Sequence, residues 1–212
     1  MARQSVVALA SVLCVSCAWA GPITITSRTG MVSGSVMDLS GPGSFLGTAP
    51  AGIGDFVLHG DDLTPSTLSS VAADLSTMFT MDKIAALGGG ESFSLVPVGG
   101  YDAAAKAELH VFFDLTTDAT ISWDFFTVFL APTATIDIEL KEVGGSAIAT
   151  GIHTLSAGSY ELHATAMFDA TGLPPGVVFS AHYGLEFLVI PLPQPALLAC
   201  AGLGLVGLRR KR

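Results

Sequence analysis

From residue 21 to about residue 190, apolar and polar residues alternate with a period close to two, which is typical of β-strands. The alternation is clearest in the second half of this region, where it predicts strands over residues 107–115, 119–130, 135–143, 159–168 and 177–189. In the first half it predicts shorter strands over residues 22–27, 30–37, 54–58 and 93–98, the last of them after a turn at Gly88, Gly89 and Gly90. Short strands separated by glycine and proline turns predict an all-β fold, an antiparallel, jelly-roll-like β-sandwich.

Residues 64–87 fit two interpretations. Thr64 and Pro65 are suited to the N-cap and the first position of a helix. Val71, Leu75 and Phe79 also belong to a series of apolar residues at every second position, which indicates a strand. We favour strands for this segment.

The predicted strand over residues 119–130 is apolar on both faces. Trp123, Phe125 and Phe129 share one face, and three further apolar residues share the other. A strand of this kind is usually central and covered on both sides, so we expect the aromatic stripe to belong to the core. In the alternative interpretation the stripe is exposed and stacks against sugar rings.

The segment Leu155 to Tyr160 reads Leu-Ser-Ala-Gly-Ser-Tyr and predicts a tyrosine corner, in which the Tyr160 hydroxyl bonds to backbone a few residues upstream. With the strands around it, the half from about residue 107 to residue 189 is similar to the C-terminal β-sandwich modules of secreted bacterial proteins. The resemblance implies a spacer or a unit that binds sugar or protein.

Charge divides the chain into a neutral or basic pair of ends and an acidic middle. Of the nine basic residues, five lie at the two ends, whereas all 18 acidic residues lie between Asp38 and Glu186. The predicted domain therefore has four basic residues against 18 acidic ones, a net charge of −14. Nucleic-acid binding rests on Lys and Arg at the phosphates, so we expect no nucleic-acid partner.

The three cysteines, Cys14, Cys17 and Cys200, all lie outside residues 21–190. The domain therefore has no disulfide framework, no cysteine-ligated zinc and no cysteine nucleophile.

Residues 1–20 read as a secretory signal peptide. Arg3 gives the positive start, the following apolar run is too short for an ordinary membrane span, and Ala18 and Ala20 form a small-residue cleavage pattern before Gly21. We expect the secretion machinery to export the chain and Gly21 to become the new N-terminus.

The C-terminal segment, residues 191–212, combines a proline-rich stretch, an apolar run and a basic cluster. Residues 191–195 contain three prolines and cannot form a continuous helix. Residues 196–208 carry no charge and predict a short transmembrane helix of about 20 Å, against about 30 Å for a hydrocarbon core. The basic cluster that follows places the domain outside the membrane by the positive-inside rule.

This order resembles the PEP-CTERM protein-sorting tail. The matching positions are the Pro193, Gln194 and Pro195 motif, the helix over 196–208, and the cap formed by Arg209, Arg210, Lys211 and Arg212. The family usually has Glu where this chain has Gln194. The resemblance implies an exosortase-type processing enzyme as partner, a transient membrane anchor, and delivery to the cell surface or the extracellular space; the alternative is a simple anchor that is never cut.

Candidate metal ligands are sparse. Asp55, His59, Asp61 and Asp62 form the densest polar cluster, and such oxygen-rich loops suit Ca²⁺, although their spacing matches no known calcium loop. Asp114 and Asp118 flank a turn in the same way. We favour solvated acidic loops at these positions and expect no cofactor, with Ca²⁺ as the alternative.

The histidines and the remaining carboxylates give no catalytic signature. His59, His110, His153, His163 and His182 lack the zincin spacing, although His153 and His163 could meet across a hairpin centred on Gly158. Asp137 and Glu139 share one face of a strand and could act as a glycosidase pair, but we favour exposed acids on an edge strand.

These features predict a non-enzymatic cell-surface or extracellular-matrix protein. A module that binds carbohydrate or calcium, with extracellular polysaccharide as partner, is the alternative, and an extracellular hydrolase comes third.

Overall fold

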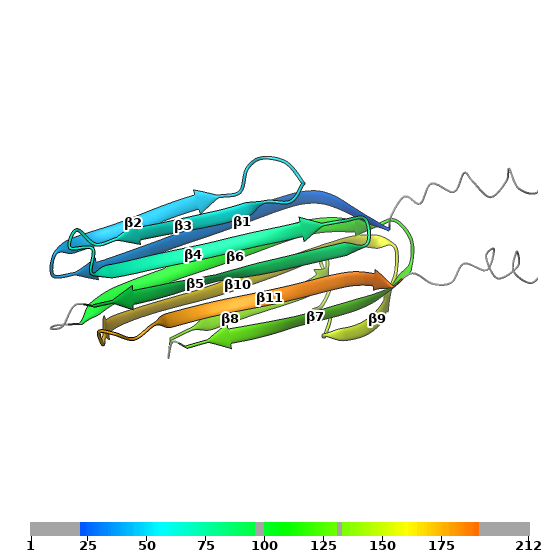
Figure 1. The fold of residues 1–212 in the computed structure, drawn as a ribbon. Helices are drawn as coiled ribbons and strands as arrows, with labels where there is room; N and C mark the ends of the chain where they lie inside the picture. The colour runs from blue at the N-terminus through cyan, green and yellow to red at the C-terminus, as the bar shows by residue number, and fades with distance from the viewer. Residues whose placement is uncertain (1–21, 96–99, 131–132, 191–212) are drawn as a thin grey trace, which may run out of the picture.

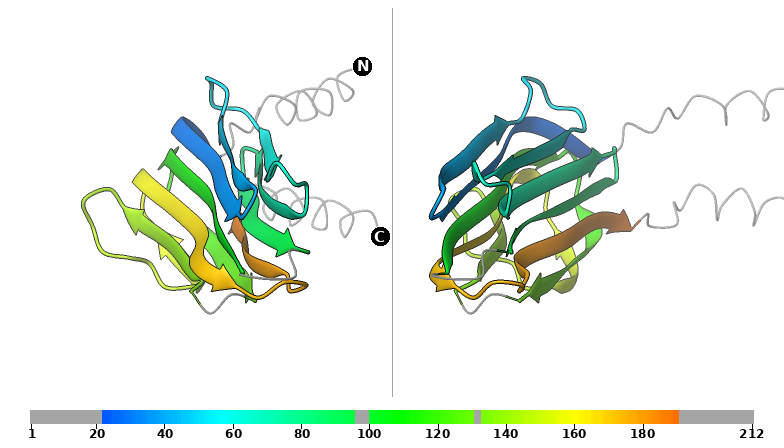
Figure 2. Two further views of the ribbon diagram at one scale, coloured as in Figure 1. Left: turned by 90° about the vertical axis from the view of Figure 1, so that its left-hand side faces the viewer. Right: turned by 60° about the vertical axis from the view of Figure 1, so that its left-hand side comes forward.

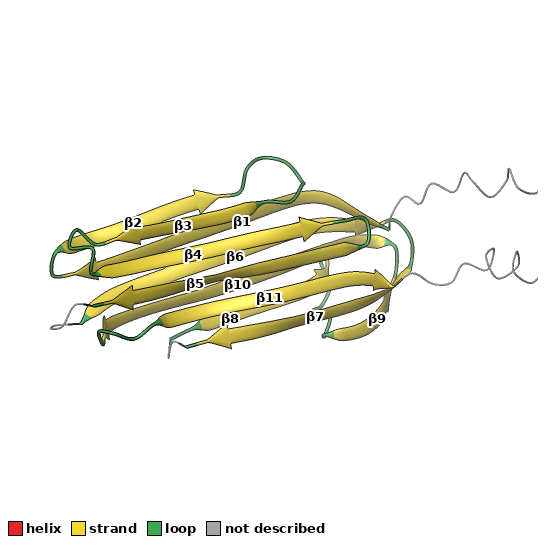
Figure 3. Ribbon diagram, viewed as in Figure 1, coloured by secondary structure: helices red, strands yellow, loops and turns green. Residues whose placement is uncertain are grey.

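A computed structural model describes residues 22–95, 100–130 and 133–190. Within these ranges the only regular structure is β-strand, so the all-β prediction is confirmed (Figure 3). No helix in the same ranges is long and apolar enough to cross a membrane. The predicted signal peptide and the predicted sorting tail lie outside the described residues.

The eleven strands of the described residues form two antiparallel sheets that face each other as layers (Figures 1 and 2). Sheet A has the order β2 (Gly41–Thr48), β1 (Ile23–Asp38), β6 (Tyr101–Leu115), β10 (Gly158–Leu173), β8 (Thr135–Glu142). Sheet B has the order β3 (Val57–Leu63), β4 (Ser69–Phe79), β5 (Lys83–Ser94), β11 (Phe179–Ile190), β7 (Ala119–Phe129), β9 (Gly151–Leu155).

The core lies between the inner faces of the two sheets, as the period-two pattern predicts. In β6 every second side chain, from Tyr101 to Leu115, is buried, and the residues between them face solvent. Phe113 of sheet A meets Phe187 of sheet B edge to face, with ring centroids 5.0 Å apart.

The glycine run Gly88, Gly89 and Gly90 lies inside β5, so the predicted turn at this position is wrong. A Cβ at Gly88 would lie 2.7 Å from the ring of Tyr183, and one at Gly90 would overlap Ala105 of the facing sheet. Glycine is required here because side chains of neighbouring strands and of the facing sheet occupy the space.

The preference for strands over residues 64–87 is confirmed by β4 and β5. The two predicted strands at the start of the domain are one strand, β1, with an irregularity in its pairing between Ile25 and Ser27. The sequence pattern predicts neither β2 nor β9, because β2 is rich in glycine and β9 has only five residues.

Residues 22 and 190 leave the sandwich at the same end, which we call the base (Figure 1). Two backbone bonds place them beside one turn: Ile23 donates to the Met81 carbonyl at 3.0 Å, and Val189 donates to the Asp82 carbonyl at 2.7 Å. The opposite end, the tip, carries the turn between β1 and β2. The 16 residues of β1 run from base to tip and span about 50 Å.

Candidate functional site: the charged face and the groove

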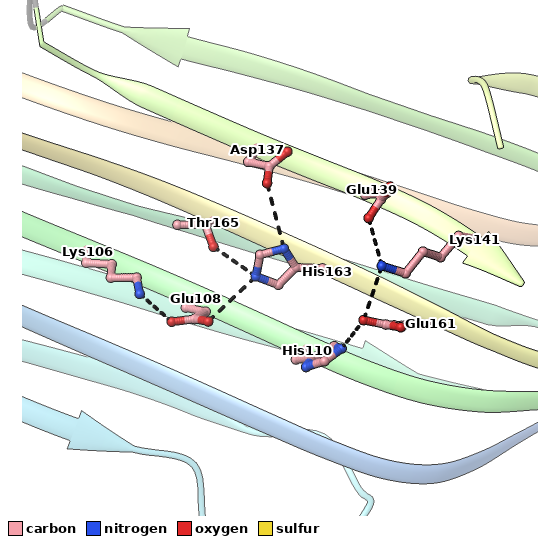
Figure 4. Close-up of polar contacts among 9 residues, drawn as sticks. All are labelled: Lys106, Glu108, His110, Asp137, Glu139, Lys141, Glu161, His163 and Thr165. Atoms are coloured by element: carbon pink, nitrogen blue, oxygen red, sulfur yellow. Dashed lines mark hydrogen bonds and ion pairs between the residues drawn. The ribbon is translucent and has the colours of Figure 1, made fainter. Parts of the chain in front are cut away.

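The outward side chains of β6, β10 and β8 form one continuous polar surface, the charged face (Figure 4). It arises because these positions alternate with buried ones along each strand and the three strands are neighbours in sheet A. Its members are Lys106, Glu108, His110, Asp137, Glu139, Lys141, Glu161, His163 and Thr165.

One series of side-chain contacts crosses all three strands. His110 Nε2 lies 2.7 Å from Glu161 Oε1, and the same oxygen lies 3.6 Å from Lys141 Nζ. Lys141 Nζ also donates to Glu139 Oε2 at 3.0 Å. The hydrogen bond to Glu139, supported by the charge of Glu161, raises the pKa of Lys141.

A second series of side-chain contacts runs beside the first. Lys106 Nζ lies 2.5 Å from Glu108 Oε2, and Glu108 Oε1 lies 3.6 Å from His163 Nε2. His163 Nδ1 lies 3.9 Å from Asp137 Oδ2, and the rings of His163 and His110 meet edge to face with centroids 5.6 Å apart. The hydrogen bond from Lys106 lowers the pKa of Glu108.

This arrangement suits a solvated ion-pair network better than acid–base chemistry. A glycosidase needs one carboxyl group with a raised pKa to act as the general acid. The pKa of Glu108 is shifted the other way, and Glu161 and Glu139 each contact a lysine. Asp137 lies on the edge strand β8 with its side chain 70% exposed, so the prediction of acids on an edge strand is confirmed.

The alternative in which His153 and His163 meet across a hairpin does not occur. His153 lies on β9 in sheet B, and His163 lies on β10 in sheet A, where it is directly opposite His110. The partners β6 and β10 are far apart in sequence, so no local pattern could reveal the pair of His110 and His163.

In the described part of the chain, no three His, Cys, Asp or Glu side chains are grouped so as to hold a metal ion. Asp55 accepts from the Phe79 amide at 2.5 Å, and Asp62 accepts from the Ser44 amide at 2.6 Å. These two carboxylates of the predicted cluster therefore serve as backbone partners rather than converging on one point.

The other two members of that cluster pair with each other. His59 lies between Asp74, 2.5 Å from its Nδ1, and Asp61, 3.4 Å from its Nε2. The hydrogen bond with Asp74 is the largest cause of a raised pKa at His59. Asp114 and Asp118 accept from the Ser159 hydroxyl and the Ala157 amide, so they join the end of β6 to the turn before β10.

The outer face of sheet B carries a groove of about 550 Å³ across β4, β5, β11 and β7. Phe126 lies directly over Gly184, where a Cβ would overlap the ring. In the next row across the sheet, Asp124 of β7 is opposite Glu186 of β11. The groove thus combines an aromatic ring that lies over the backbone of β11 with two adjacent carboxylates that could accept hydrogen bonds from hydroxyl groups, one of which, Glu186, also pairs with Lys83 at 2.9 Å.

The aromatic stripe of β7 is divided between core and solvent. Trp123 is 1% exposed, whereas Phe125 and Phe129 are 39% and 61% exposed. The expectation of a central strand covered on both sides is therefore wrong for residues 125–129, which also lie beyond the part of β7 that pairs with β9. The predicted tyrosine corner is confirmed: the Tyr160 hydroxyl donates to the Ser156 carbonyl at 2.8 Å.

The predicted cleavage residues Ala18, Ala20 and Gly21 and the predicted sorting residues 193–195 and 209–212 lie outside the described residues. No protein-family model, curated protein or solved structure matches this chain.

Proposed function

We propose that this chain is an exported, non-enzymatic cell-surface or extracellular-matrix protein whose sandwich is held at its base by the C-terminal segment. The observation that carries the proposal is the placement of residues 22 and 190 at one end of an elongated sandwich (Figure 1). A chain entering and leaving at one end can be tethered there without unfolding any strand.

The geometry fits a projecting role. A tether after residue 190 would hold the base near the membrane and point the tip outward, about 50 Å away along β1. The excess of 18 acidic over four basic residues in the domain favours solubility and repulsion from anionic lipid. The cleavage pattern at Ala20 and Gly21 supports export, and the Pro193–Pro195 motif with its basic cap supports sorting by an exosortase-type enzyme.

Two tags test the sorting step in the natural host. One tag is inserted in the exposed loop at Gly52, where the space around the backbone is open, and the other follows Arg212. Processing should separate the tags, and Pro193→Ala with Pro195→Ala should keep them together in the membrane fraction. Pro50→Ala is the matched control and should leave processing unchanged. Tags that stay together at full mass in the unaltered chain would contradict the proposal.

Carbohydrate binding is the second candidate, and the groove on sheet B is the observation that favours it. Aromatic faces stack against sugar rings, and neighbouring carboxylates accept hydrogen bonds from the sugar hydroxyl groups. Affinity electrophoresis in gels that contain bacterial polysaccharide tests this function. Phe126→Ala should abolish retardation, and Phe129→Ala, an equally exposed aromatic on the other face of β7, should preserve it. Absence of retardation for the unaltered chain across polysaccharides of differing charge would exclude the groove.

A further inference from the structure

The second half of β7 has a free edge. Among the described strands, β9 pairs with residues 119–123, and beyond them β7 pairs only with β11. Leu130 donates its amide to the Ser180 carbonyl at 2.8 Å, so the even-numbered residues of β7 direct their backbone groups toward β11. In an antiparallel ladder the alternate residues face the other way. Phe125, Thr127 and Phe129 therefore present their N–H and C=O groups at the free edge.

The other edges of the described sheets carry features that oppose pairing with another chain. β2 contains Pro42 and three glycines, and β3 contains His59, Asp61 and Asp62. β8 is charged along its length and is partly covered by a bridge to Ala147. β9 is only five residues long.

The free edge of β7 has one such feature, Asp124, whose carboxylate accepts the Phe125 amide at 2.8 Å. From Phe125 to Leu130 this segment carries no charge. The exposed fractions of its large side chains are 39% for Phe125, 58% for Phe126, 49% for Val128, 61% for Phe129 and 65% for Leu130. An uncharged edge with apolar side chains on both faces is suited to adding another strand.

We propose that two copies of this chain pair through this edge, with their β7 strands antiparallel and centred on Thr127. In that register Thr127 is opposite its own counterpart, and Phe125 is opposite Phe129 of the other copy. All three residues direct their backbone groups at the free edge, so each opposing pair can exchange both N–H···O bonds, the Phe125 amide then donating to the other copy's Phe129 carbonyl in place of the Asp124 carboxylate. Registers in which odd-numbered residues oppose odd-numbered residues meet this condition, and of these the register centred on Thr127 pairs the whole free segment.

The same register places compatible side chains together. On the inner face of the sheet, Phe125 meets Phe129, and on the outer face Phe126 meets Val128. The two Asp124 carboxylates lie at opposite ends of the paired segment, about 20 Å apart at the usual rise per residue. That distance exceeds the screening length of about 8 Å in physiological salt, so the like charges do not oppose association. Parallel pairing in register would instead bring the two carboxylates together.

The free edge is therefore complementary to the same edge of a second copy. The antiparallel arrangement points the two bases in opposite directions. If the chain is tethered as proposed above, pairing would join copies on facing surfaces or copies released into the matrix; this consequence rests on the proposed function, and the pairing does not.

Disulfide trapping of the purified full-length chain in mild detergent tests the register. Cys14→Ser, Cys17→Ser and Cys200→Ser remove the native thiols. Residues that exchange both backbone bonds have Cα atoms about 5.5 Å apart, within the range a disulfide spans. Thr127→Cys should therefore give a disulfide-linked dimer under mild oxidation. Leu87→Cys is the control, because Leu87 is 56% exposed on the same sheet but away from this edge. We expect roughly tenfold more dimer from Thr127→Cys.

A mixture of Phe125→Cys and Phe129→Cys chains should form the mixed dimer, and each variant alone should form much less. Thr127→Pro removes a free-edge N–H and no bond to β11, so sedimentation should show loss of the dimer while circular dichroism keeps its β signal. Equal dimer from Thr127→Cys and Leu87→Cys, or linkage of each phenylalanine position chiefly to itself, would overturn the proposal. Because purified chain is used, these outcomes do not depend on export or sorting.

Discussion

The two long sides of the sandwich differ in how the sheets are joined. On the side of β2 and β3, Phe45 packs against Gly34 of its own sheet and Gly60 of the facing sheet. The Ser44 amide donates to Asp62 across the same gap. On the side of β8 and β7, Trp123 donates to the Ile148 carbonyl at 3.3 Å near the base, but Phe125 and Phe129 are exposed farther along.

Asp38 strengthens the first side at the tip. Its carboxylate belongs to sheet A and accepts hydrogen bonds from the hydroxyl groups of Thr64, Ser66 and Ser69 in the segment that enters β4 of sheet B. The Ser40 amide also donates to it. Burial alone would raise the pKa of Asp38, but the hydrogen bonds from Ser40, Thr64 and Ser69 outweigh burial and hold this pKa well below its usual range.

The side of β2 and β3 therefore contributes more to the stability of the fold, whereas the proposed pairing of two copies uses the opposite side. Close packing against glycines and a charged hydrogen-bond network hold the sheets together along β2 and β3. The other side leaves apolar side chains and backbone groups available for a second molecule. Four predictions can contradict or refine this division.

The largest difference is expected from two phenylalanine truncations. Phe45→Ala removes a ring packed between the sheets and should lower the free energy of unfolding by about 2–3 kcal/mol. Phe129→Ala removes an exposed ring and should change it by less than about 0.5 kcal/mol. Urea unfolding followed by circular dichroism measures both. Similar losses for the two variants would mean that the β7 side also holds the sheets together.

The next effect concerns the tip. Asp38→Asn removes the charge that several donors share, and should lower the free energy of unfolding by about 2 kcal/mol at pH 7. Asp137→Asn, a carboxylate exposed on β8, is the control and should cost less than about 0.5 kcal/mol.

The Asp38 contribution should also depend on pH in a definite direction. Because its folded pKa is depressed, the stabilisation is complete above the unfolded value of about 3.9 and is lost as the pH falls toward the folded pKa. The gap in stability between the unaltered chain and Asp38→Asn should therefore narrow from pH 7 to acid. A gap that stays constant would show that the carboxylate charge is not what stabilises the tip.

The smallest effect is expected at His59 on the exposed edge strand β3. Its pKa is raised by the hydrogen bond and charge of Asp74, so this pair stabilises the fold below the unfolded pKa of about 6.5 and loses the effect as the pH rises through the folded value. NMR titration should show a raised pKa that falls markedly in Asp74→Asn and less in Asp61→Asn. The exposed pair should contribute less than about 0.5 kcal/mol. An equal fall in both variants would contradict the role of Asp74.

The sequence by itself determined the fold class, most strands of the second half, the tyrosine corner and the cysteine-free domain. Each of these depends on residues close together in the chain: the alternation along β6, or the five residues from Ser156 to Tyr160. The same local information predicts the two terminal segments, which lie outside the described residues.

Only the tertiary structure decided which strands are neighbours. Gly88 to Gly90 resembled a turn because the sequence does not show that Tyr183 and Ala105 occupy the space where their side chains would lie. The meeting of His110 with His163 depends on pairing between β6 and β10, which are separated by three intervening strands in the chain. The apolar second half of β7 resembled a core strand, but its large side chains are exposed and its edge lies beyond the five residues that pair with β9. Alternation shows which side chains share one face of a strand. The facing sheet determines whether that face is covered, and the neighbouring strand in the same sheet determines whether the edge is paired.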